Sequence, residues 1–413
     1  MTGGPDVDVL VVGGGPAGLA AARAARRGGA ARVLVVERED EAGGVPRHCA
    51  HTGFGLRDLH RVMNGPAYAR RITALARDAG VEVATRTMVT GWAADGSARM
   101  TGPGGPARVR AGAVVLATGA RERPRAARLV PGDRPAGVLT TGELQQRVHL
   151  QHLAIGGRAI VVGAEHVSYS ACLTLRHAGV RTVAMVTEWG RHQSWPAFAA
   201  ATALGLRVPL WTATRVTAIR GHGRVEAVEL TDLTTGRTRT VDADTVVFTG
   251  DWIPDHELAR AAAVAVDPGS LGPRVDQRGA TSADGVFATG NLVHPAETAD
   301  VAARGAHRAG QAAAAWARGE RRAGGGVPVV AVPPLRWVSP ATVVPGLGPA
   351  ARVTARTTRF VARGAVVVEQ TGRELARHRV RGAAPNRSLT FAARWMEAVD
   401  PSAGPVVIRV EEG

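Results

Sequence analysis

Three glycines near the start of the chain have the spacing of a dinucleotide-binding turn. Gly13, Gly15 and Gly18 follow an apolar run over residues 8–12, and an alanine-rich stretch continues from them to about residue 27. In such a strand, turn and helix, the first glycine permits the tight turn, the second lets the backbone approach a pyrophosphate, and the third lets the helix pack closely on the strand. The helix N-terminus then carries the diphosphate charge, so this spacing predicts a dinucleotide site.

An acidic residue completes this first unit. A second apolar strand, residues 32–36, ends in Glu37, whose carboxylate is placed to accept hydrogen bonds from an adenosine ribose and disfavours a 2′-phosphate. A glycine-rich turn alone is weak evidence in a chain with 52 glycines among 413 residues. The strand, the helix and the acid together favour a bound dinucleotide over a plain turn.

A second strand, turn, helix and strand repeat the first unit without its glycines. The strand covers residues 158–162, the helix is expected to reach about residue 178, and the next strand covers residues 182–186. Glu165 and Ser168 stand where the second and third glycines belong, so a side chain and a negative charge occupy the pyrophosphate position. We interpret this unit as scaffold in preference to a working nicotinamide site, and the second interpretation stays open.

Two further strands end in Ala-Thr-Gly, at residues 117–119 and 288–290. Together with the two units, they resemble the two-dinucleotide-binding-domain flavoproteins of the pyridine nucleotide-disulfide oxidoreductase superfamily over about residues 7–318. The resemblance implies an α/β fold of two Rossmann-like domains, with parallel sheets and antiparallel meanders. It implies a discontinuous FAD-binding domain (residues 1–135 and 252–325) and an inserted NAD(P)-like domain with a degenerate fingerprint (136–251). The alternating stretches 215–230 and 238–249 are expected to form the antiparallel strands.

The resemblance also implies which residues hold FAD. In that family the last Ala-Thr-Gly strand meets the ribityl chain, where Asn291 stands in place of a more usual aspartate, and the helix beginning near residue 300 directs its N-terminus at the flavin. The expected FAD-binding residues are Gly13, Gly15, Pro16, Ala17, Gly18, Glu37, Arg38, Gly44, Val45, Arg47, Val89, Ala117, Thr118, Gly119, Gly290, Asn291 and Val301.

Several loops look like one subfamily, the group formed by the opine oxidase A subunits and the hydrogen cyanide synthase B subunits. The loops are residues 43–48, 64–69, 131–138 and 291–297. This implies an FAD-dependent subunit that dehydrogenates an amine or amino-acid derivative and passes electrons to a flavin-containing or iron–sulfur partner subunit. The chain lacks the cysteine-rich segment that better-known members carry toward their C-terminus.

The two cysteines exclude several chemistries. Cys49 and Cys172 form no CxxC or CxxxxC pattern, so a dithiol relay within one chain is not expected. Two cysteines also cannot hold an iron–sulfur cluster or a structural zinc ion, and we predict no metal site.

Amine oxidation needs an unprotonated nitrogen, and histidine is the side chain best suited to accept a proton near pH 7. By the family architecture His48, His51 and His294, the last with Glu297 nearby, lie near the flavin and are the candidate bases. Arg47 is suited to clamp a substrate carboxylate or to balance flavin charge. The alternative is that these side chains merely hydrogen-bond the backbone or FAD.

The remaining features set the broad class of protein. The net charge is +16, but all basic residues are arginine and aromatic residues make up 4%, so nucleic-acid binding is not expected. No signal segment or apolar run of membrane-spanning length is found, which predicts a cytoplasmic protein. Beyond a glycine-rich linker (319–326), residues 326–413 are expected to form a small β-rich appended domain, favoured as a dimer or subunit contact over a catalytic part. Two alternatives to the amine dehydrogenase remain: an NAD(P)H-dependent flavin reductase resembling ferredoxin reductases, and a non-catalytic FAD-bearing relay or scaffold protein.

Overall fold

The computed structural model describes residues 5–295, 297–320 and 325–413, which divide into two compact units. Unit 1 takes its residues from Met1–Arg47, Thr52–Ala120 and Pro254–Gly413, and unit 2 consists of His48–His51 and Arg121–Ile253. The chain leaves and re-enters unit 1 through β10 (Ala120–Glu122) and β19 (Trp252–Pro254), which form a two-stranded sheet. The sequence placed these passages at residues 135 and 252. Residues 321–324 of the expected linker lie outside the described residues.

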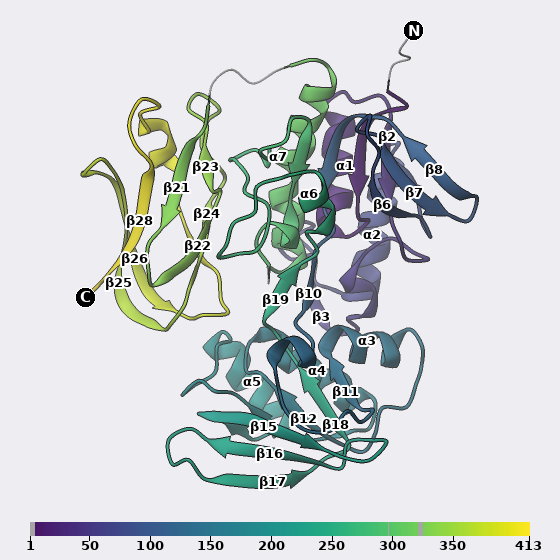
Figure 1. Cartoon of the computed structure of the whole chain (residues 1–413), viewed down its shortest axis with the longest axis vertical. Helices are drawn as coiled ribbons and strands as arrows, with labels where there is room; N and C mark the ends of the chain where they lie inside the picture. Colours follow the sequence, from purple (N-terminus) through teal and green to yellow (C-terminus); the bar gives the residue numbers. More distant parts are fainter. Residues whose placement is uncertain (1–4, 296, 321–324) are drawn as a thin grey trace. The chain divides into compact units, whose positions relative to one another are not determined.

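Unit 1 is built on a five-stranded parallel sheet of order β20-β9-β1-β2-β5. Figure 1 labels β2 of this sheet and the helices α1 and α7 of the same unit. Its central strand β1 is almost wholly buried, as expected for a parallel strand covered on both faces. A three-stranded antiparallel sheet, β6-β7-β8, is attached to it, and β3 pairs with β4. The strands are β1 (Val7–Val12), β2 (Val33–Val36), β3 (Thr52–Phe54), β4 (Met63–Asn64), β5 (Glu82–Ala84), β6 (Met88–Trp92), β7 (Ala98–Gly102), β8 (Gly105–Val109), β9 (Ala111–Leu116) and β20 (Val286–Ala288).

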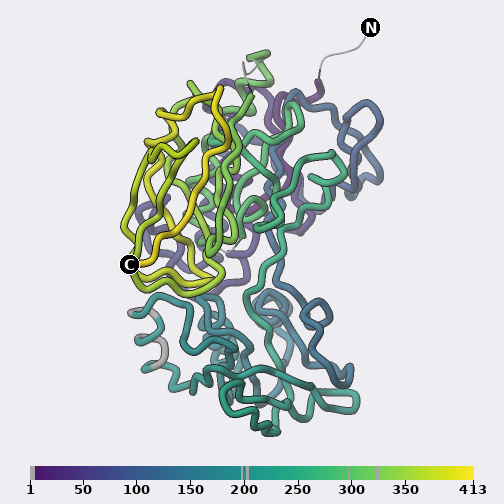
Figure 2. The backbone as a smooth tube through the Cα atoms, turned by 60° about the vertical axis from the view of Figure 1, so that its left-hand side comes forward, coloured from purple at the N-terminus to yellow at the C-terminus, as the bar shows by residue number. Residues whose placement is uncertain are grey.

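Two alanine-rich helices pack together over this sheet. Helix α1 (Pro16–Arg27) begins with proline, whose missing N–H costs nothing in the first turn. Helix α7 (Ala299–Ala317) approaches α1 closely because its Gly310 has no side chain to hold the two backbones apart. Figure 2 shows the resulting neighbours, the green α7 segment beside the purple amino-terminal segment. The remaining helices of unit 1 are α2 (Gly65–Asp78) and α6 (Glu257–Ala261), with the short 3-10 turn η3 (Gly290–Leu292). The 3-10 turn η1 (Val45–His48) begins in unit 1 and its last residue belongs to unit 2.

Unit 2 repeats this architecture. Its parallel sheet has the order β11-β18-β12-β13-β14, with an antiparallel sheet of order β15-β16-β17. The strands are β11 (Val138–Thr140), β12 (Arg158–Val162), β13 (Arg181–Val186), β14 (Leu210–Trp211), β15 (Thr214–Arg220), β16 (Ala227–Asp232), β17 (Thr238–Asp242) and β18 (Thr245–Phe248). The helices are α3 (Thr141–His149), α4 (His166–His177) and α5 (Pro196–Leu206), with the 3-10 turn η2 (Arg125–Arg128). The expectation that residues 238–249 are all antiparallel is wrong for β18, whose four side chains are buried and which pairs in parallel with β11 and β12.

The C-terminal part of unit 1 is all β. One sheet has the order β23-β21-β28-β25-β26 and the other β22-β24-β27, and side chains from both form one hydrophobic core. The strands are β21 (Val327–Ala331), β22 (Leu335–Ser339), β23 (Thr342–Val343), β24 (Val353–Thr357), β25 (Val361–Gln370), β26 (Arg373–Ala383), β27 (Leu389–Phe391) and β28 (Val406–Glu412), with the 3-10 turn η4 (Arg394–Ala398) before the last strand. The predicted two-domain α/β fold with a β-rich C-terminal region is confirmed.

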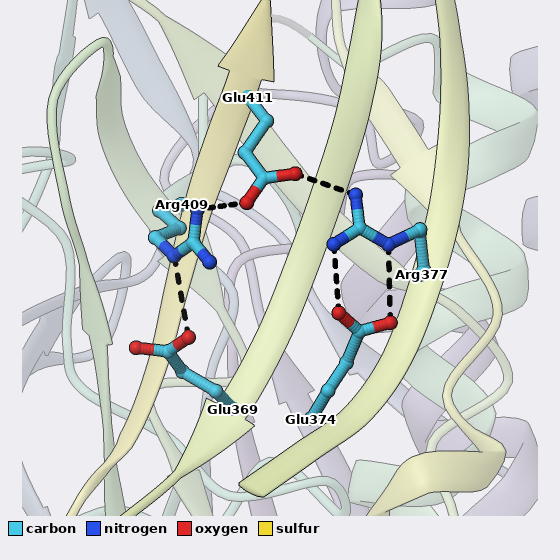
Figure 3. Close-up of polar contacts among 5 residues, drawn as sticks. All are labelled: Glu369, Glu374, Arg377, Arg409 and Glu411. Carbon is cyan, nitrogen blue, oxygen red and sulfur yellow. Dashed lines mark hydrogen bonds and ion pairs between the residues drawn. The ribbon is translucent and has the colours of Figure 1, made fainter. Parts of the chain in front are cut away.

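An ion-pair network ties three strands of the larger sheet together (Figure 3). Arg377 on β26 makes two hydrogen bonds to Glu374, of 3.1 and 2.7 Å, and one of 2.5 Å to Glu411 on β28. Arg409 on β28 pairs with the same Glu411 and, across the sheet, with Glu369 on β25 at 3.2 Å. These groups are solvent-accessible, so the network adds register specificity more than free energy.

Among the described residues, none of the helices combines the length and the apolar composition of a membrane-spanning segment.

Candidate functional site

The turn from β1 into α1 requires glycine at two positions for steric reasons. Gly13 has φ +105°, and a Cβ there would lie 2.5 Å from the carbonyl oxygen of Ala117. A Cβ on Gly18 would overlap the carbonyl oxygen of Gly13. These two glycines therefore set the turn and the close approach of helix to strand that the sequence predicted.

Gly15 is different, because the fold itself does not require it. It has ordinary extended backbone angles, and the nearest atom to a Cβ built there is the Cα of Gly44, 3.8 Å away. Within the described residues, no side chain caps α1 at this end. Uncapped N–H groups facing open space, reached through a residue without a side chain, fit the diphosphate of FAD.

Glu37 lies at the carboxyl end of β2 with only 7% of its surface exposed. Its Oε2 accepts a 2.8 Å hydrogen bond from the N–H of Gly14, and its Oε1 accepts one of 2.9 Å from the N–H of Glu39. Each carboxylate oxygen has two lone pairs, so both can still accept a ribose hydroxyl. Arg38, the next residue, is exposed and lies 3.6 Å from Glu39.

The two Ala-Thr-Gly strands end beside this turn, as the crevice at the carboxyl edge of a parallel sheet requires. Thr118 donates a 2.7 Å hydrogen bond to the carbonyl of Asp255. Gly290, with φ +72°, leaves space for Ala17, since a Cβ on Gly290 would lie 2.5 Å from the Cβ of Ala17. Gly119 also has positive φ, and a Cβ there would meet nothing within 4 Å.

The side chain of Asn291 holds its own loop. Its Nδ2 donates to the carbonyl of Glu297 at 3.2 Å, and its Oδ1 accepts from the N–H of Glu297 at 3.0 Å. One amide hydrogen and one lone pair remain for a ribityl hydroxyl. The replacement of the usual aspartate by asparagine therefore supplies a donor that a carboxylate lacks, and this donor braces residues 291–297.

The first turn of α7 contains a buried carboxylate, that of Asp300. Asp300 is 3% exposed and its Oδ1 accepts a 2.9 Å hydrogen bond from the N–H of Val301. Arg57 faces the same carboxylate at 3.3 Å. The Val301 N–H is thus already engaged, and Arg57 adds a positive charge near the helix N-terminus.

The other expected FAD-binding residues have mixed environments. Gly44 has φ +62° and packs against Gly15, while the side chain of Val45 is exposed. Arg47 is mostly buried, and its Nε lies 3.7 Å from Glu41. The side chain of Val89 is buried in the core of unit 1.

The three candidate histidines are divided between the two units. His48 is buried in unit 2, with Nδ1 3.3 Å from Oε1 of Gln145, and His51 lines a cavity of about 260 Å³ in unit 2 with His149 and His177. His294 belongs to unit 1, four residues after Gly290. Its ring is largely buried, and this burial lowers the pKa of His294, an effect that the nearby Glu297 carboxylate opposes.

Both cysteines are free and buried. Cys49 donates from Sγ to Oε1 of Gln145 at 3.2 Å, and burial raises the pKa of each thiol to about 12. Thiols protonated at neutral pH are poor nucleophiles, which fits the exclusion of dithiol chemistry. Among the described residues, no group of histidine, cysteine and acidic side chains could hold a metal ion.

In unit 2 the corresponding turn is filled by its own side chains. Glu165 is 5% exposed and its Oε2 accepts a 3.0 Å hydrogen bond from the N–H of Ala164. Ser168 is fully buried and its hydroxyl lies 2.7 Å from that of Thr249. A Cβ on Gly163 would lie 2.8 Å from both Glu165 Oε2 and Ser168 Oγ, so little space remains at this turn.

Sequence reasoning missed several buried polar residues. Glu122 accepts a 2.8 Å hydrogen bond from the N–H of Gly142, and burial raises the pKa of Glu122 to about 7. Trp337, Arg356 and Ser388 of the C-terminal sheets contact the loop that contains His294. No motif includes these positions: Glu122 follows the first Ala-Thr-Gly motif without belonging to it, and the other three lie in the C-terminal part of the chain, far from the nucleotide fingerprints.

The family model of pyridine nucleotide-disulphide oxidoreductases matches residues 7–319. The fold is similar to thioredoxin reductase of Lactococcus lactis, with a TM-score of 0.63 and 17% identity over 76% of this chain and 100% of that one. That likeness supports the fold alone.

Similar proteins include components of multi-component enzymes. The alpha subunit of sarcosine oxidase from Corynebacterium sp. (strain P-1) is 30% identical over 60% of this chain and 26% of its own length. The ferredoxin–NAD(+) reductase component of the benzene 1,2-dioxygenase system of Pseudomonas putida is 29% identical over 52% and 51%. The A subunit of the opine oxidase of Rhizobium meliloti is 27% identical over 72% and 61%.

The chain thus spans between a quarter and about three fifths of the length of these relatives. The match to the family model, however, covers both nucleotide-type units, the first of which has a turn that fits FAD. The chain belongs to the pyridine nucleotide-disulphide oxidoreductase family and is an FAD-dependent oxidoreductase.

Proposed function

We propose that this oxidoreductase dehydrogenates an amine or amino-acid derivative, as one component of an opine-type dehydrogenase or oxidase complex. The observation that carries the proposal is the contrast between the two turns. The turn at Gly15 is open and uncapped, whereas the turn at Gly163 is filled by Glu165 and Ser168. One open dinucleotide site and one closed turn favour an electron donor other than NAD(P)H.

The closed turn disfavours a nicotinamide cofactor for two reasons. The Glu165 carboxylate takes the Ala164 N–H, one of the backbone donors at this turn. A pyrophosphate would also meet a buried negative charge, and like charges in a poorly solvated site repel strongly. Electrons are therefore expected from an organic substrate, and two of the relatives are named for such substrates, sarcosine and opines.

FAD, when bound, supplies the hydride acceptor for this chemistry. The hydrogen leaves the substrate carbon as a hydride, with both electrons of the C–H bond, and the nitrogen lone pair forms the C=N bond. Because this lone pair must be free, the amine has to be unprotonated. His294 is the residue that we assign to remove the amine proton, because its lowered pKa keeps the imidazole neutral at pH 7. Water then adds to the C=N bond to release a carbonyl compound and an amine. The two electrons leave through a flavin or iron–sulfur centre of a partner protein.

A second candidate is an NAD(P)H-dependent reductase, which the ferredoxin–NAD(+) reductase relative favours. The two are separated by an anaerobic titration of the purified yellow protein, following the flavin absorbance. We expect no bleaching by stoichiometric NADH or NADPH and bleaching by sarcosine or an opine. Rapid bleaching by a nicotinamide would contradict the proposal and establish the reductase.

A matched variant tests this interpretation of the second turn. Glu165→Gly combined with Ser168→Gly should keep FAD, because neither residue belongs to the first unit. If these side chains alone close the turn, the double variant gains bleaching by NADH that the parent lacks. A protein that retains FAD, is reduced by dithionite and accepts electrons from no amine would instead support the electron-relay role.

A further inference from the structure

The loop after β20 is held from both sides within unit 1. Asn291 clamps the backbone of Glu297 from inside the loop, as described above. From the other side, Arg356 on β24 donates a 3.1 Å hydrogen bond from one terminal nitrogen to the carbonyl of Pro295. The same nitrogen donates to Oγ of Ser388 at 3.0 Å. The β-rich C-terminal part therefore fixes the backbone beside His294.

The side chains of this loop are engaged as well. Glu297 is only 8% exposed at its side chain, and its Oε1 accepts a short hydrogen bond from the hydroxyl of Ser388. The same oxygen lies 3.8 Å from the guanidinium of Arg356 and 3.8 Å from Nδ1 of His294. One carboxylate oxygen thus faces a histidine, an arginine and a serine.

The indole ring of Trp337 packs against both nitrogen-containing partners of Glu297, His294 and Arg356. The ring of Trp337 on β22 stacks on the ring of His294, with centroids 5.6 Å apart and planes inclined by 23°. The guanidinium of Arg356 lies over the same tryptophan, 5.3 Å from its centroid. Trp337 and Arg356 are both at least nine-tenths buried, so this arrangement is packed, not a surface contact.

Two nitrogens in this cluster have no hydrogen-bond partner within the described residues, Nδ1 of His294 and Nε of Arg356. The Nδ1 atom is fully buried although 21% of the His294 side chain is exposed, so the exposed part is another portion of the ring. A proton on Nδ1 would point toward the Glu297 carboxylate and leave Nε2 as the acceptor. This is the tautomer that a general base needs.

We propose that the C-terminal β-rich part is a working component of the flavin site, with Arg356, Trp337 and Ser388 as positioning residues for the His294–Glu297 pair. The inference rests on the proposed function, in which His294 accepts the amine proton. The proton moves from the substrate nitrogen to Nε2 of His294, and the Glu297 carboxylate then faces the resulting imidazolium. This proposed role at the site differs from the dimer or subunit contact that the sequence favoured for residues 326–413.

The charges around His294 predict the direction of the pH response. Glu297 favours the imidazolium and Arg356 opposes it, while Arg336 on β22 acts on Arg356. Removing the positive charge of Arg356 therefore raises the pKa of His294. Removing the Ser388 hydroxyl frees Oε1 of Glu297 and moves the pKa of His294 in the same direction.

The test uses Arg356→Met, which keeps the length of the side chain without its charge, and Ser388→Ala, which is the milder change should the first fail to fold. Arg359→Met is the matched control, since Arg359 lies on the same part of the chain but is half exposed and pairs with Glu412. Flavin reduction by the amine is measured anaerobically from about pH 4.5 to 9, so that the range includes a histidine pKa below its ordinary value. Histidine-ring NMR of the same proteins, with the His294 signal assigned by its loss in His294→Gln, reports the pKa without turnover.

We expect both variants to bind FAD and to shift the His294 titration and the acid limb of the pH profile upward, by up to about one pH unit, so that the rate falls most on the acid side of the profile. His294→Gln should lose roughly a hundredfold or more, as expected for a missing general base. An unchanged pH profile and His294 titration in both variants would overturn the inference. If no amine reduces the wild-type flavin but the His294 titration still shifts, the proposed function fails and the positioning role stands.

Discussion

The contact between α1 and α7 offers the sharpest test of how this fold forms its cofactor site. A Cβ on Gly310 of α7 would overlap the carbonyl oxygen of Ala21 on α1 and lie 2.8 Å from its carbon. Carbon atoms in favourable contact are about 3.5–4.0 Å apart. Gly310→Ala must therefore separate the two helices by at least about 0.7 Å, and backbone atoms cannot move aside as a flexible side chain can.

The free-energy cost of separating the two helices is partly offset by the higher helix propensity of alanine. Overpacking a tight interior costs about 1–3 kcal/mol, and a rigid backbone contact belongs at the upper end. Replacing glycine by alanine within a helix returns about 1 kcal/mol. The expected net loss for Gly310→Ala is therefore about 2 kcal/mol. Because α1 begins at the open turn of Gly15, its displacement should also weaken FAD binding.

Gly305 on the same helix is the matched control. It is exposed, and a Cβ there meets nothing within 4 Å, so Gly305→Ala should gain about 1 kcal/mol and leave FAD binding unchanged. Urea unfolding followed by flavin fluorescence measures both properties in one experiment. Equal unfolding midpoints and equal FAD affinities for the two variants would refute the reasoning.

Three further predictions follow from single groups. Gly15→Ala should fold normally yet lose FAD, because its methyl group meets no protein atom closer than the Cα of Gly44 at 3.8 Å but lies where the diphosphate is expected, whereas Gly13→Ala should also lose stability because Gly13 has a positive φ. Dialysis against FAD-free buffer measures FAD retention and thermal unfolding measures stability, and FAD retained by Gly15→Ala would contradict the assignment of the FAD site. Burial raises the pKa of Glu122 from 4.5 to about 7, so the folded state holds a proton that the unfolded state has released, and stability should fall by about 3 kcal/mol as pH rises through this window. Glu122→Gln should weaken this dependence of the unfolding free energy on pH, as measured by urea unfolding. An unchanged pH dependence would show that other groups cause it. Hydrogen bonds from Arg377 lower the pKa of Glu411 in the network of Figure 3, so this network should stabilise the protein near neutral pH and lose that effect as the pH falls below the ordinary carboxyl range. Arg377→Gln should therefore reduce the fall of the thermal unfolding temperature at acid pH, and high salt should have the same effect on the parent protein.

The fold was largely readable from the sequence because its signals are local. Apolar runs before glycine turns predicted β1, β12 and the helices that follow them, and the structure has α1 at Pro16–Arg27 and α4 at His166–His177. The error at β18 has a physical cause. Alternation predicted an antiparallel strand, but Thr245–Phe248 lies in the parallel sheet and is buried throughout, a pattern that periodicity cannot assign to one sheet or the other.

The candidate site was predictable only in part. The FAD-binding turn follows from three glycine positions, since its geometry is set within a few residues of chain. The surroundings of the histidines are different, because their partners come from elsewhere. Gln145 beside His48 belongs to helix α3 of unit 2, and Trp337 beside His294 belongs to a strand of the C-terminal sheets.

The sequence by itself therefore determined the class of the protein: an FAD-dependent two-unit α/β oxidoreductase without a dithiol. Local spacing is sufficient for the dinucleotide turn, because turn and helix geometry depend on neighbouring residues, and the family that the ordered motifs resemble implies FAD and the oxidoreductase class. Only the tertiary structure decided that Glu165 folds back to fill its own turn and that Arg356 and Ser388 meet Glu297 beside His294. These contacts join residues about sixty to ninety positions apart or depend on a side-chain rotamer, and close packing of the folded chain selects them.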